Sequence, residues 1–225
     1  MARRGGSQVE EREVDVLSGA VTLKGILAVP RNPVGVVLFA HGSGSGRFSP
    51  RNSYVARVLQ NGGIATLLMD LLTEEEAQDR RLVFDIDLLT RRVLDATEWL
   101  SKQPETRGLP MGYFGASTGA AAALQAAAQK GESISAVVSR GGRPDLAMDH
   151  LSKVKAPTLL IVGGNDEPVI ELNRAAYNLL AGPKDLVIVP GASHLFEEPG
   201  TLEQVARLAR DWFRRYMAQA VRKAA

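Results

Sequence analysis

The sequence predicts an α/β protein built on a mostly parallel sheet with helices on both faces. The first observation is that six short apolar runs alternate with segments of helical periodicity along most of the chain. The second is that these runs are almost continuously apolar, which is typical of parallel strands buried on both faces. The third is size, since 225 residues, 45% of them hydrophobic and 23% charged, suffice for one sizeable core.

The chain opens with a different pattern. Between residues 14 and 30, apolar and polar residues alternate on either side of Ser18-Gly19, which favours two antiparallel strands at a sheet edge. We expect residues 1–12 to be disordered and residues 13–225 to form one domain.

The six apolar runs are the remaining expected strands, and the helices lie between them. The last helix is the clearest, because residues 201–204 offer a capping box and the apolar residues that follow recur at helical spacing. The expected strands are residues 34–40, 64–72, 111–116, 134–139, 158–162 and 186–189, and the expected helices are roughly residues 52–61, 85–102, 118–130, 168–181 and 201–219.

Composition excludes several kinds of chemistry. The chain has no cysteine, so disulfides, zinc-thiolate sites, iron-sulfur clusters and thiol nucleophiles are ruled out. Lysine plus arginine (27) nearly balances aspartate plus glutamate (25), so nothing in the charge demands a nucleic-acid partner. The first ten residues do not resemble a signal peptide and no run is long enough to span a bilayer. We therefore expect a cytoplasmic protein without a membrane partner.

The most informative segment is residues 111–120, an expected strand that stops at Gly115-Ala116-Ser117-Thr118-Gly119 and continues as a helix of small residues. This is the pattern of a nucleophile elbow. The serine of such an elbow has a strained backbone that lifts its hydroxyl above the sheet, and the flanking glycines avoid collisions across the sharp turn. Ser117 is therefore the expected nucleophile.

A serine hydroxyl becomes a good nucleophile only when a base takes its proton. Three histidines compete for this role. His194 follows the expected strand 186–189, at the carboxyl end, where open α/β sheets gather their active sites. His41 lies in a glycine-rich turn that is better suited to binding a substrate oxygen, and His150 is expected at the surface of a helix. We expect His194 to be the base.

The imidazole needs an acid that fixes its tautomer and stabilises its charged form. Asp166 comes directly after an expected strand and is the best candidate. The alternative is that Asp166 only caps the helix that begins near Pro168, a common position for aspartate. Glu167 and Asp145 are weaker candidates for the partner of His194.

Negative charge that develops on a substrate oxygen needs two preorganised N–H donors. One is the backbone N–H of Thr118, directly after the nucleophile. The other is expected in the glycine-rich turn 41–46, where we place it on Ser43 with Gly42 and Gly44 as alternates. Such a turn also suits a phosphate group, but it lacks the lysine of a Walker loop and the spacing of a dinucleotide site.

The chain resembles the α/β-hydrolase superfamily over about 200 residues, and within it the dienelactone hydrolase-like branch. The motifs that carry the resemblance are the His41-Gly42 turn, the Ser117 elbow, residues 163–166 and residues 191–194, together with the order serine, aspartate, histidine. The resemblance implies an eight-stranded sheet in the α/β-hydrolase fold. It also implies hydrolysis of esters or lactones through an acyl-enzyme, with no metal or cofactor.

One departure from that branch concerns the site itself. Dienelactone hydrolases use a cysteine nucleophile and a glutamate near the oxyanion turn, whereas this chain has Ser117 and Gly42. We therefore expect a general carboxylesterase rather than a dienelactone hydrolase. Only residues 140–156 separate the sixth strand from the seventh, so we expect no large lid and an open site for small esters.

Several loop residues near the expected triad are candidates for substrate binding. Arginines that face the pocket would favour an anionic substrate through bidentate pairing, although they equally suit a role in ordering loops. The candidates are Arg47, Phe48 and Arg140, with Arg51 and Arg143 as further arginines.

Together these residues predict a serine hydrolase in which Ser117, His194 and Asp166 cleave a small-molecule ester. The alternative is a non-catalytic protein of the same fold that binds a small molecule or docks a partner. The sequence is compatible with a monomer or a homodimer.

Overall fold

The computed structural model describes residues 9–224 and contains one eight-stranded sheet in the order β1-β2-β4-β3-β5-β6-β7-β8. β1 and β2 pair antiparallel, β2 also runs antiparallel to β4, and all remaining pairs are parallel. The predicted fold class is therefore confirmed. The strands are β1 (Val9–Ser18), β2 (Val21–Pro30), β3 (Val36–Ala40), β4 (Ala65–Met69), β5 (Met111–Ala116), β6 (Ile134–Arg140), β7 (Thr158–Gly163) and β8 (Lys184–Val189).

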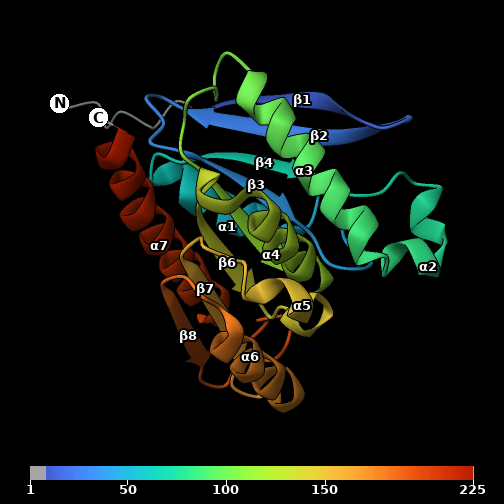
Figure 1. Cartoon of the computed structure of the whole chain (residues 1–225), viewed down its shortest axis with the longest axis vertical. Coiled ribbons are helices and arrows are strands. Elements are labelled where there is room, and N and C mark those ends of the chain that lie inside the picture. Colours follow the sequence, from blue (N-terminus) through green and yellow to red (C-terminus); the bar gives the residue numbers. More distant parts are fainter. Residues whose placement is uncertain (1–8, 225) are drawn as a thin grey trace.

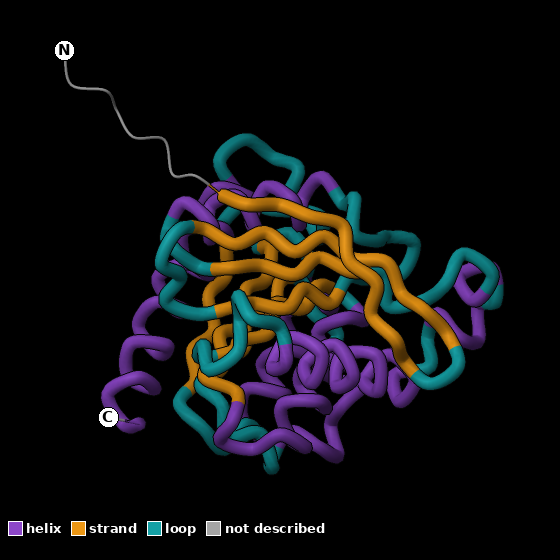
Figure 2. Tube along the Cα trace, turned by 90° about the horizontal axis from the view of Figure 1, so that it is seen from above, coloured by secondary structure: helices purple, strands orange, loops and turns teal. Residues whose placement is uncertain are grey.

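The predicted hairpin is present and is longer than expected. β1 pairs with β2 from Val9 opposite Pro30 to Ser18 opposite Val21, and Gly19 makes the turn with a φ of +58°. Figure 2 shows these two long strands extending beyond the rest of the twisted sheet. Of the predicted disordered segment, residues 1–8 lie outside the described residues. For residues 9–12 the prediction is wrong, because their backbone groups pair with β2.

Helices cover both faces of the sheet, as Figure 1 shows. α1 and α7 pack together on one face, whereas α3, α4 and α6 lie on the other. Among the described residues, no helix is long and apolar enough to cross a membrane. The helices are α1 (Pro50–Asn61), η1 (Glu76–Gln78), α2 (Arg80–Val83), α3 (Ile86–Lys102), α4 (Thr118–Lys130), η2 (Gly131–Ser133), η3 (Pro144–Ala147), α5 (Met148–Leu151), α6 (Glu167–Leu179) and α7 (Thr201–Ala224).

Two apolar clusters, one on each face of the sheet, form the core. On the α1/α7 face, the rings of Phe39 and Phe114 pack with centroids 4.8 Å apart. Gly112 lets α7 approach β5 closely, since a Cβ there would lie 2.7 Å from the ring of Phe213. On the opposite face the buried hydroxyls of Tyr113 and Thr97 are 2.7 Å apart, which satisfies both polar groups.

The parallel strands all end at one edge of the sheet. Because β3, β5, β6, β7 and β8 run in the same direction, the loops that follow them meet there. These loops begin after Ala40, Ala116, Arg140, Gly163 and Val189. They include every residue that the sequence proposes for the reaction.

Candidate active site

The elbow after β5 has the strained geometry that its sequence predicts. Ser117 has φ +51° and ψ −122°, a combination that costs an L-residue on the order of 1–3 kcal/mol. Both glycines of the motif are required, because a side chain at either position would collide with backbone atoms. A Cβ on Gly115 would lie 2.4 Å from the Cα of Ala120, and one on Gly119 would lie 2.2 Å from the carbonyl oxygen of Ala40. The close packing of β3, β5 and α4 therefore holds Ser117 at the rim of the sheet.

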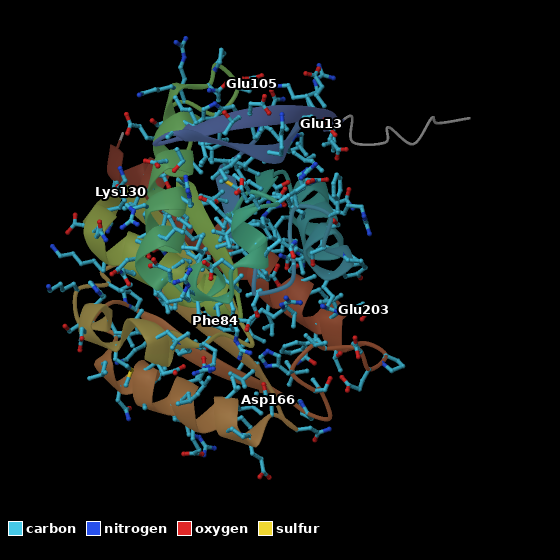
Figure 3. The ribbon with its side chains drawn as sticks, turned by 90° about the vertical axis from the view of Figure 1, so that its right-hand side faces the viewer. Glu13, Phe84, Glu105, Lys130, Asp166 and Glu203 are labelled. Atoms are coloured by element: carbon cyan, nitrogen blue, oxygen red, sulfur yellow. The ribbon has the colours of Figure 1, made fainter. Side chains whose placement is uncertain are left out.

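His194 and Asp166, separated by 28 positions in the chain, meet at this rim. The Nδ1 atom of His194 lies 2.6 Å from Oδ2 of Asp166, a distance typical of a charge-assisted hydrogen bond. Asp166 occupies the N-cap position of α6, yet its side chain accepts no hydrogen bond from that helix. Figure 3 shows Asp166 at the start of this helix. The side chain of Asp166 therefore serves His194 and not the helix, contrary to the capping alternative.

The loop after β6 connects the two halves of this arrangement. The N–H of Ser117 donates to the carbonyl of Arg140 at 3.3 Å, and the N–H of Arg143 donates to the carbonyl of Ser117 at 3.0 Å. Between these residues, a Cβ on Gly141 would lie 3.6 Å from both Cε1 and Nδ1 of His194. Ser117 and His194 thus adjoin the same short loop, although no hydrogen bond joins their side chains in the part of the chain that the structure describes.

The glycine-rich turn after β3 faces the nucleophile. A Cβ on Gly42 would lie 2.9 Å from the Cβ of Ser117, so this position requires glycine. Ser43, in this turn, and Thr118, directly after Ser117, carry the two backbone N–H groups that the sequence proposes as oxyanion donors. Both residues line one cavity. The two residues that are expected to supply the oxyanion donors therefore border the same space.

His41 holds this turn in place, a role that the sequence did not reveal. Its Nδ1 donates to the carbonyl of Gly42 at 2.9 Å, and its Nε2 accepts the N–H of Leu71 at 2.9 Å. Burial lowers the pKa of His41, which outweighs the opposing effects of the Gly42 carbonyl and of Asp70. His41 is therefore neutral at physiological pH and joins the ends of β3 and β4.

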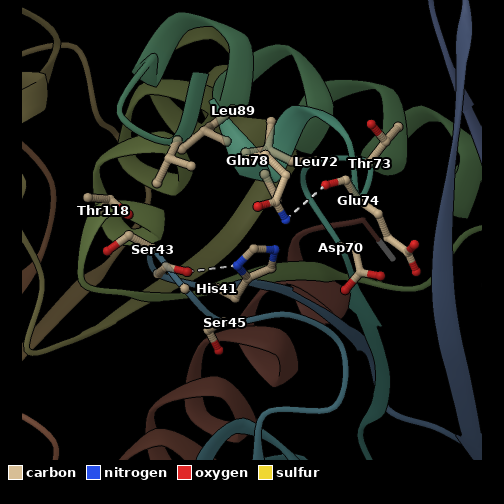
Figure 4. Close-up of a pocket in the computed structure, with 14 residues that line it drawn as sticks. His41, Ser43, Ser45, Asp70, Leu72, Thr73, Glu74, Gln78, Leu89 and Thr118 are labelled. Atoms are coloured by element: carbon tan, nitrogen blue, oxygen red, sulfur yellow. Dashed lines mark hydrogen bonds between the residues drawn. The ribbon is translucent and has the colours of Figure 1, made fainter. Parts of the chain in front are cut away.

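The cavity beside Ser43 and Thr118 has a volume of about 360 Å³ (Figure 4). Its floor is the turn 41–45, and its apolar wall comes from the loop after β4, from the segment that contains η1 and α2, and from α3. Figure 1 shows α2 at one end of the molecule. The apolar lining residues are Leu72, Ala77, Val83 and Leu89.

Sequence reasoning missed the η1–α2 segment as part of the site. The available signal was the sequence from Thr73 to Glu76, whose side chains each accept the other's backbone N–H, at 3.1 and 2.9 Å. Arg92 of α3 fastens the segment by donating to Glu76 and to the carbonyl of Ser18, both at 2.8 Å. Between β6 and β7 the structure contains the short helices η3 and α5, whereas the η1–α2 segment, which lies between β4 and α3, borders the cavity.

Arg47 and Phe48, two predicted substrate-binding residues, lie outside this cavity. The guanidinium of Arg47 pairs with the carboxylate of Asp70, and its backbone N–H donates to the same group at 2.7 Å. Phe48 is 64% exposed and lies under the guanidinium of Arg47, whose Cζ is 4.2 Å from the ring centroid. Arg47 therefore reaches the site only through Asp70, which lines the cavity.

The other arginines differ sharply in their pairing. Arg143 makes two hydrogen bonds to Asp145, at 2.8 and 2.7 Å, so Asp145 is occupied and is not a partner of His194. Arg140, in contrast, is only 7% exposed, and its Nε and Nη1 atoms are buried without a partner. Burial, followed by the charge of Arg51, lowers the pKa of Arg140 to about 10. Arg140 is thus a charged, largely unsatisfied group next to Ser117.

No group of three or more histidine, aspartate or glutamate side chains within residues 9–224 is arranged to hold a metal ion.

The sheet order, the elbow and the arrangement of the loops define an α/β-hydrolase. The chain belongs to the dienelactone hydrolase family, whose family model matches residues 23–222. Family and fold together support hydrolase activity in general.

Two relatives show how this chain compares with known proteins. A dienelactone hydrolase from Anabaena variabilis has a crystal structure that is 59% identical, with a TM-score of 0.91 over 93% of this chain and 99% of that one. A Mycobacterium tuberculosis protein named "Putative phosphoribosyl transferase" is 61% identical over 205 residues, which are 91% of this chain and 46% of that protein. The chain therefore spans about half the length of these curated relatives.

More distant structures share the fold alone. Est1E from Butyrivibrio proteoclasticus, solved with ferulic acid bound, is 18% identical with a TM-score of 0.80, over 91% of this chain and 99% of that one.

Proposed function

We propose that this protein is a serine hydrolase that cleaves small carboxylic esters or lactones. The observation that carries the proposal is the 2.6 Å contact between His194 and Asp166, on the same rim as the strained Ser117. Ser43 and Thr118, whose N–H groups are the proposed oxyanion donors, line one cavity and add support. A binding protein needs neither a strained serine nor an oriented imidazole.

In the first half of the proposed reaction, Ser117 attacks the ester carbonyl. Its Oγ forms a bond to the carbonyl carbon while its proton passes to Nε2 of His194, whose Nδ1–H is held by Asp166. The carbonyl oxygen takes up the negative charge and is bound by the N–H groups of Ser43 and Thr118. The C–O bond to the alcohol then breaks, and His194 gives its proton to the leaving oxygen. The product is an acyl group on Ser117.

In the second half, water replaces the alcohol. His194 takes a proton from the water as its oxygen attacks the acyl carbon, and the same two N–H groups bind the second oxyanion. The bond to Ser117 breaks, the serine oxygen recovers its proton from His194, and the carboxylic acid leaves. The protein's groups return to their starting state without a cofactor.

The cavity indicates which part of a substrate is bound beside the reacting carbonyl. Its volume of about 360 Å³ and its apolar wall suit a short hydrocarbon group. We expect kcat/KM to rise with acyl length to a few carbons and to decline sharply for long chains. A panel of 4-nitrophenyl esters measures this directly.

A fluorophosphonate probe tests the proposal against the non-catalytic alternative, because it labels a serine only when an adjacent base activates it. We expect labelling of the natural chain and of the control variant Ser133→Ala, which removes an exposed serine far from the site. Labelling should be lost in Ser117→Ala. Equal labelling of Ser117→Ala and the natural chain would refute the assigned nucleophile.

The name of the Mycobacterium relatives raises phosphoribosyl transfer as an activity of a longer protein. We do not propose it for this chain, because the glycine-rich turn packs against Ser117 at Gly42 and lacks the lysine of a Walker loop. If the chain neither cleaved esters nor reacted with the probe, the choice of ester hydrolysis over phosphoribosyl transfer would be refuted.

A further inference from the structure

The glycine-rich turn that carries Ser43 is anchored at two points by residues that follow β4. At the start of the turn, Nε2 of His41 accepts the N–H of Leu71 at 2.9 Å. Towards the other end, the backbone N–H of Arg47 donates to Oδ1 of Asp70 at 2.7 Å. Asp70 and Leu71 are the first two residues after β4, so one short stretch of chain holds both ends of the turn.

Asp70 is itself fixed to the sheet and binds the turn firmly. Its own N–H donates to the carbonyl of Lys24 in β2 at 2.9 Å. Its second carboxylate oxygen, Oδ2, accepts a hydrogen bond from the guanidinium of Arg47, and the two side chains are only 24% and 22% exposed. Hydrogen bonds to a carboxylate are charge-assisted and stronger than those between neutral groups. One side chain therefore holds both the backbone and the guanidinium of Arg47.

The turn between these anchors has little internal support. Residues 43–45 are exposed, and the N–H of Ser45 donates to the carbonyl of Gly42 at a long distance of 3.3 Å. Glycine-rich backbone loses much conformational entropy when it is ordered, so its conformation depends on contacts from outside. The approach of Asp70 also requires glycine at position 46, because a Cβ on Gly46 would lie 2.6 Å from Oδ1 of the carboxylate.

Asp70 lies on the wall of the candidate active site. It lines the same cavity as Ser43 and Thr118, as Figure 4 shows for its lining residues. An unpaired carboxylate at this place would oppose the negative charge that forms on a substrate oxygen. Its ion pair with Arg47 offsets that charge. The guanidinium therefore allows a carboxylate to anchor the turn without working against the proposed reaction.

We propose that Asp70 is a positioning residue, which binds the backbone of Arg47 and so holds the turn with the N–H of Ser43 directed at the carbonyl oxygen of the ester. This inference rests on the proposed hydrolase function and adds to it a residue that acts through the turn. An oxyanion donor is effective because it is preorganised, and a displacement of about 1 Å costs about 100-fold in rate. The oxyanion exists in the transition state and not in the bound substrate. Loss of Asp70 therefore lowers kcat and leaves KM almost unchanged.

Two independent substitutions break the contact in different ways. Asp70→Ala removes the carboxylate, whereas Gly46→Ala keeps it and displaces it with the added methyl group. With 4-nitrophenyl butyrate, we expect kcat to fall by about 100-fold in Asp70→Ala and by about 10-fold in Gly46→Ala, with KM within about threefold in both. Asp70→Asn should keep more activity than Asp70→Ala, because the amide oxygen can still accept the N–H of Arg47. Gly46→Ala keeps the test open if Asp70→Ala does not fold.

A control variant and a transition-state analogue separate positioning from simple loss of stability. Thr106→Val is the control, because it removes a buried hydrogen bond to the carbonyl of Leu100, 2.6 Å long, in the loop that precedes β5 at the opposite edge of the sheet. We expect it to lower the melting temperature without changing kcat or KM. Butylboronic acid forms a tetrahedral, anionic adduct with an active-site serine. Its inhibition constant should rise in Asp70→Ala by about the factor by which kcat/KM falls, and should not change in Thr106→Val.

Amide hydrogen exchange follows the turn without relying on activity. Exchange within residues 41–47 should be faster in Asp70→Ala and Gly46→Ala than in the natural chain, and unchanged in Thr106→Val. Unchanged exchange in the turn, a kcat within about threefold of the natural chain, or a rise in KM alone overturns the role of Asp70 and leaves the hydrolase intact. If the natural chain cleaves no ester in a Ser117-dependent manner, the proposed function fails instead, and hydrogen exchange alone decides whether Asp70 holds the turn.

Discussion

Replacing Asp166 by asparagine separates the catalytic role of this residue from a structural one. The carboxylate accepts the Nδ1–H of His194 at 2.6 Å and makes no hydrogen bond to α6. An asparagine amide is nearly the same size but can present an N–H to Nδ1. The imidazole then places its own proton on Nε2, the atom that must accept the proton of Ser117.

The expected loss follows from that change of tautomer. In comparable triads such a substitution lowers kcat by about 10⁴, which corresponds to about 5.4 kcal/mol in the activation free energy. The effect on stability should be much smaller, because one hydrogen bond contributes only about 0.5–1.5 kcal/mol to folding. A large loss of rate with a nearly unchanged melting temperature is therefore the signature of the proposed role.

The assay is hydrolysis of 4-nitrophenyl butyrate, with thermal unfolding measured on the same samples. Glu167→Gln is the matched control, since it removes the neighbouring, exposed carboxylate and should leave kcat/KM unchanged. The capping alternative makes the opposite prediction, because asparagine caps helices as well as aspartate does. A rate within tenfold of the natural chain would refute the role assigned to Asp166.

Three further perturbations test other parts of the site. Ser117→Ala should lower kcat by about 10⁶ while circular dichroism shows a folded protein, and a near-normal rate would exclude Ser117 as nucleophile. Gly42→Ala should lower kcat by about 100-fold or more, since the added methyl lies 2.9 Å from Ser117 and displaces the oxyanion turn; full activity would contradict this geometry. The lowered pKa of His41 means that the unfolded chain binds a proton more readily than the folded one as the pH falls below about 6.5. Urea unfolding at pH 7.5 and 5.5 should therefore show a loss of stability, with a slope of at most about 1.4 kcal/mol per pH unit from this group, and His41→Gln should remove that part of the slope.

Much of the fold was predictable because burial on both faces makes parallel strands nearly continuous in their apolar residues. β5, for example, is buried at all six positions, and its sequence ends directly in the elbow. The hairpin was harder to predict from the sequence. Its first residues, Glu10 to Glu13, carry charges because β1 is an edge strand, so the sequence resembled a polar tail.

The expected pairing of His194 with Asp166 appears in the structure because strand ends in a parallel sheet converge regardless of their distance in the chain. The contacts of the residues around this pair could not be predicted from the sequence in the same way. The neutral state of His41 depends on its burial, and the occupation of Asp145 depends on its hydrogen bonds to Arg143. Neither is visible as a sequence motif. Contacts of this kind depend on loop conformation, which local sequence patterns do not determine.

Substrate specificity was the least predictable feature, because the reacting groups and the residues around them depend on different kinds of contact. The reacting groups sit on backbone fixed by close contacts, such as those of Gly115 and Gly119, and few other residues fit there. The apolar wall depends instead on the η1–α2 segment, whose position rests on the ion pair of Arg92 with Glu76. The burial of Arg140 was not predictable either, because in sequence this residue looks like the last residue of an ordinary strand. If the proposed function holds, changes in the side chains that pack around this rim should alter the substrate without disturbing the proposed chemistry.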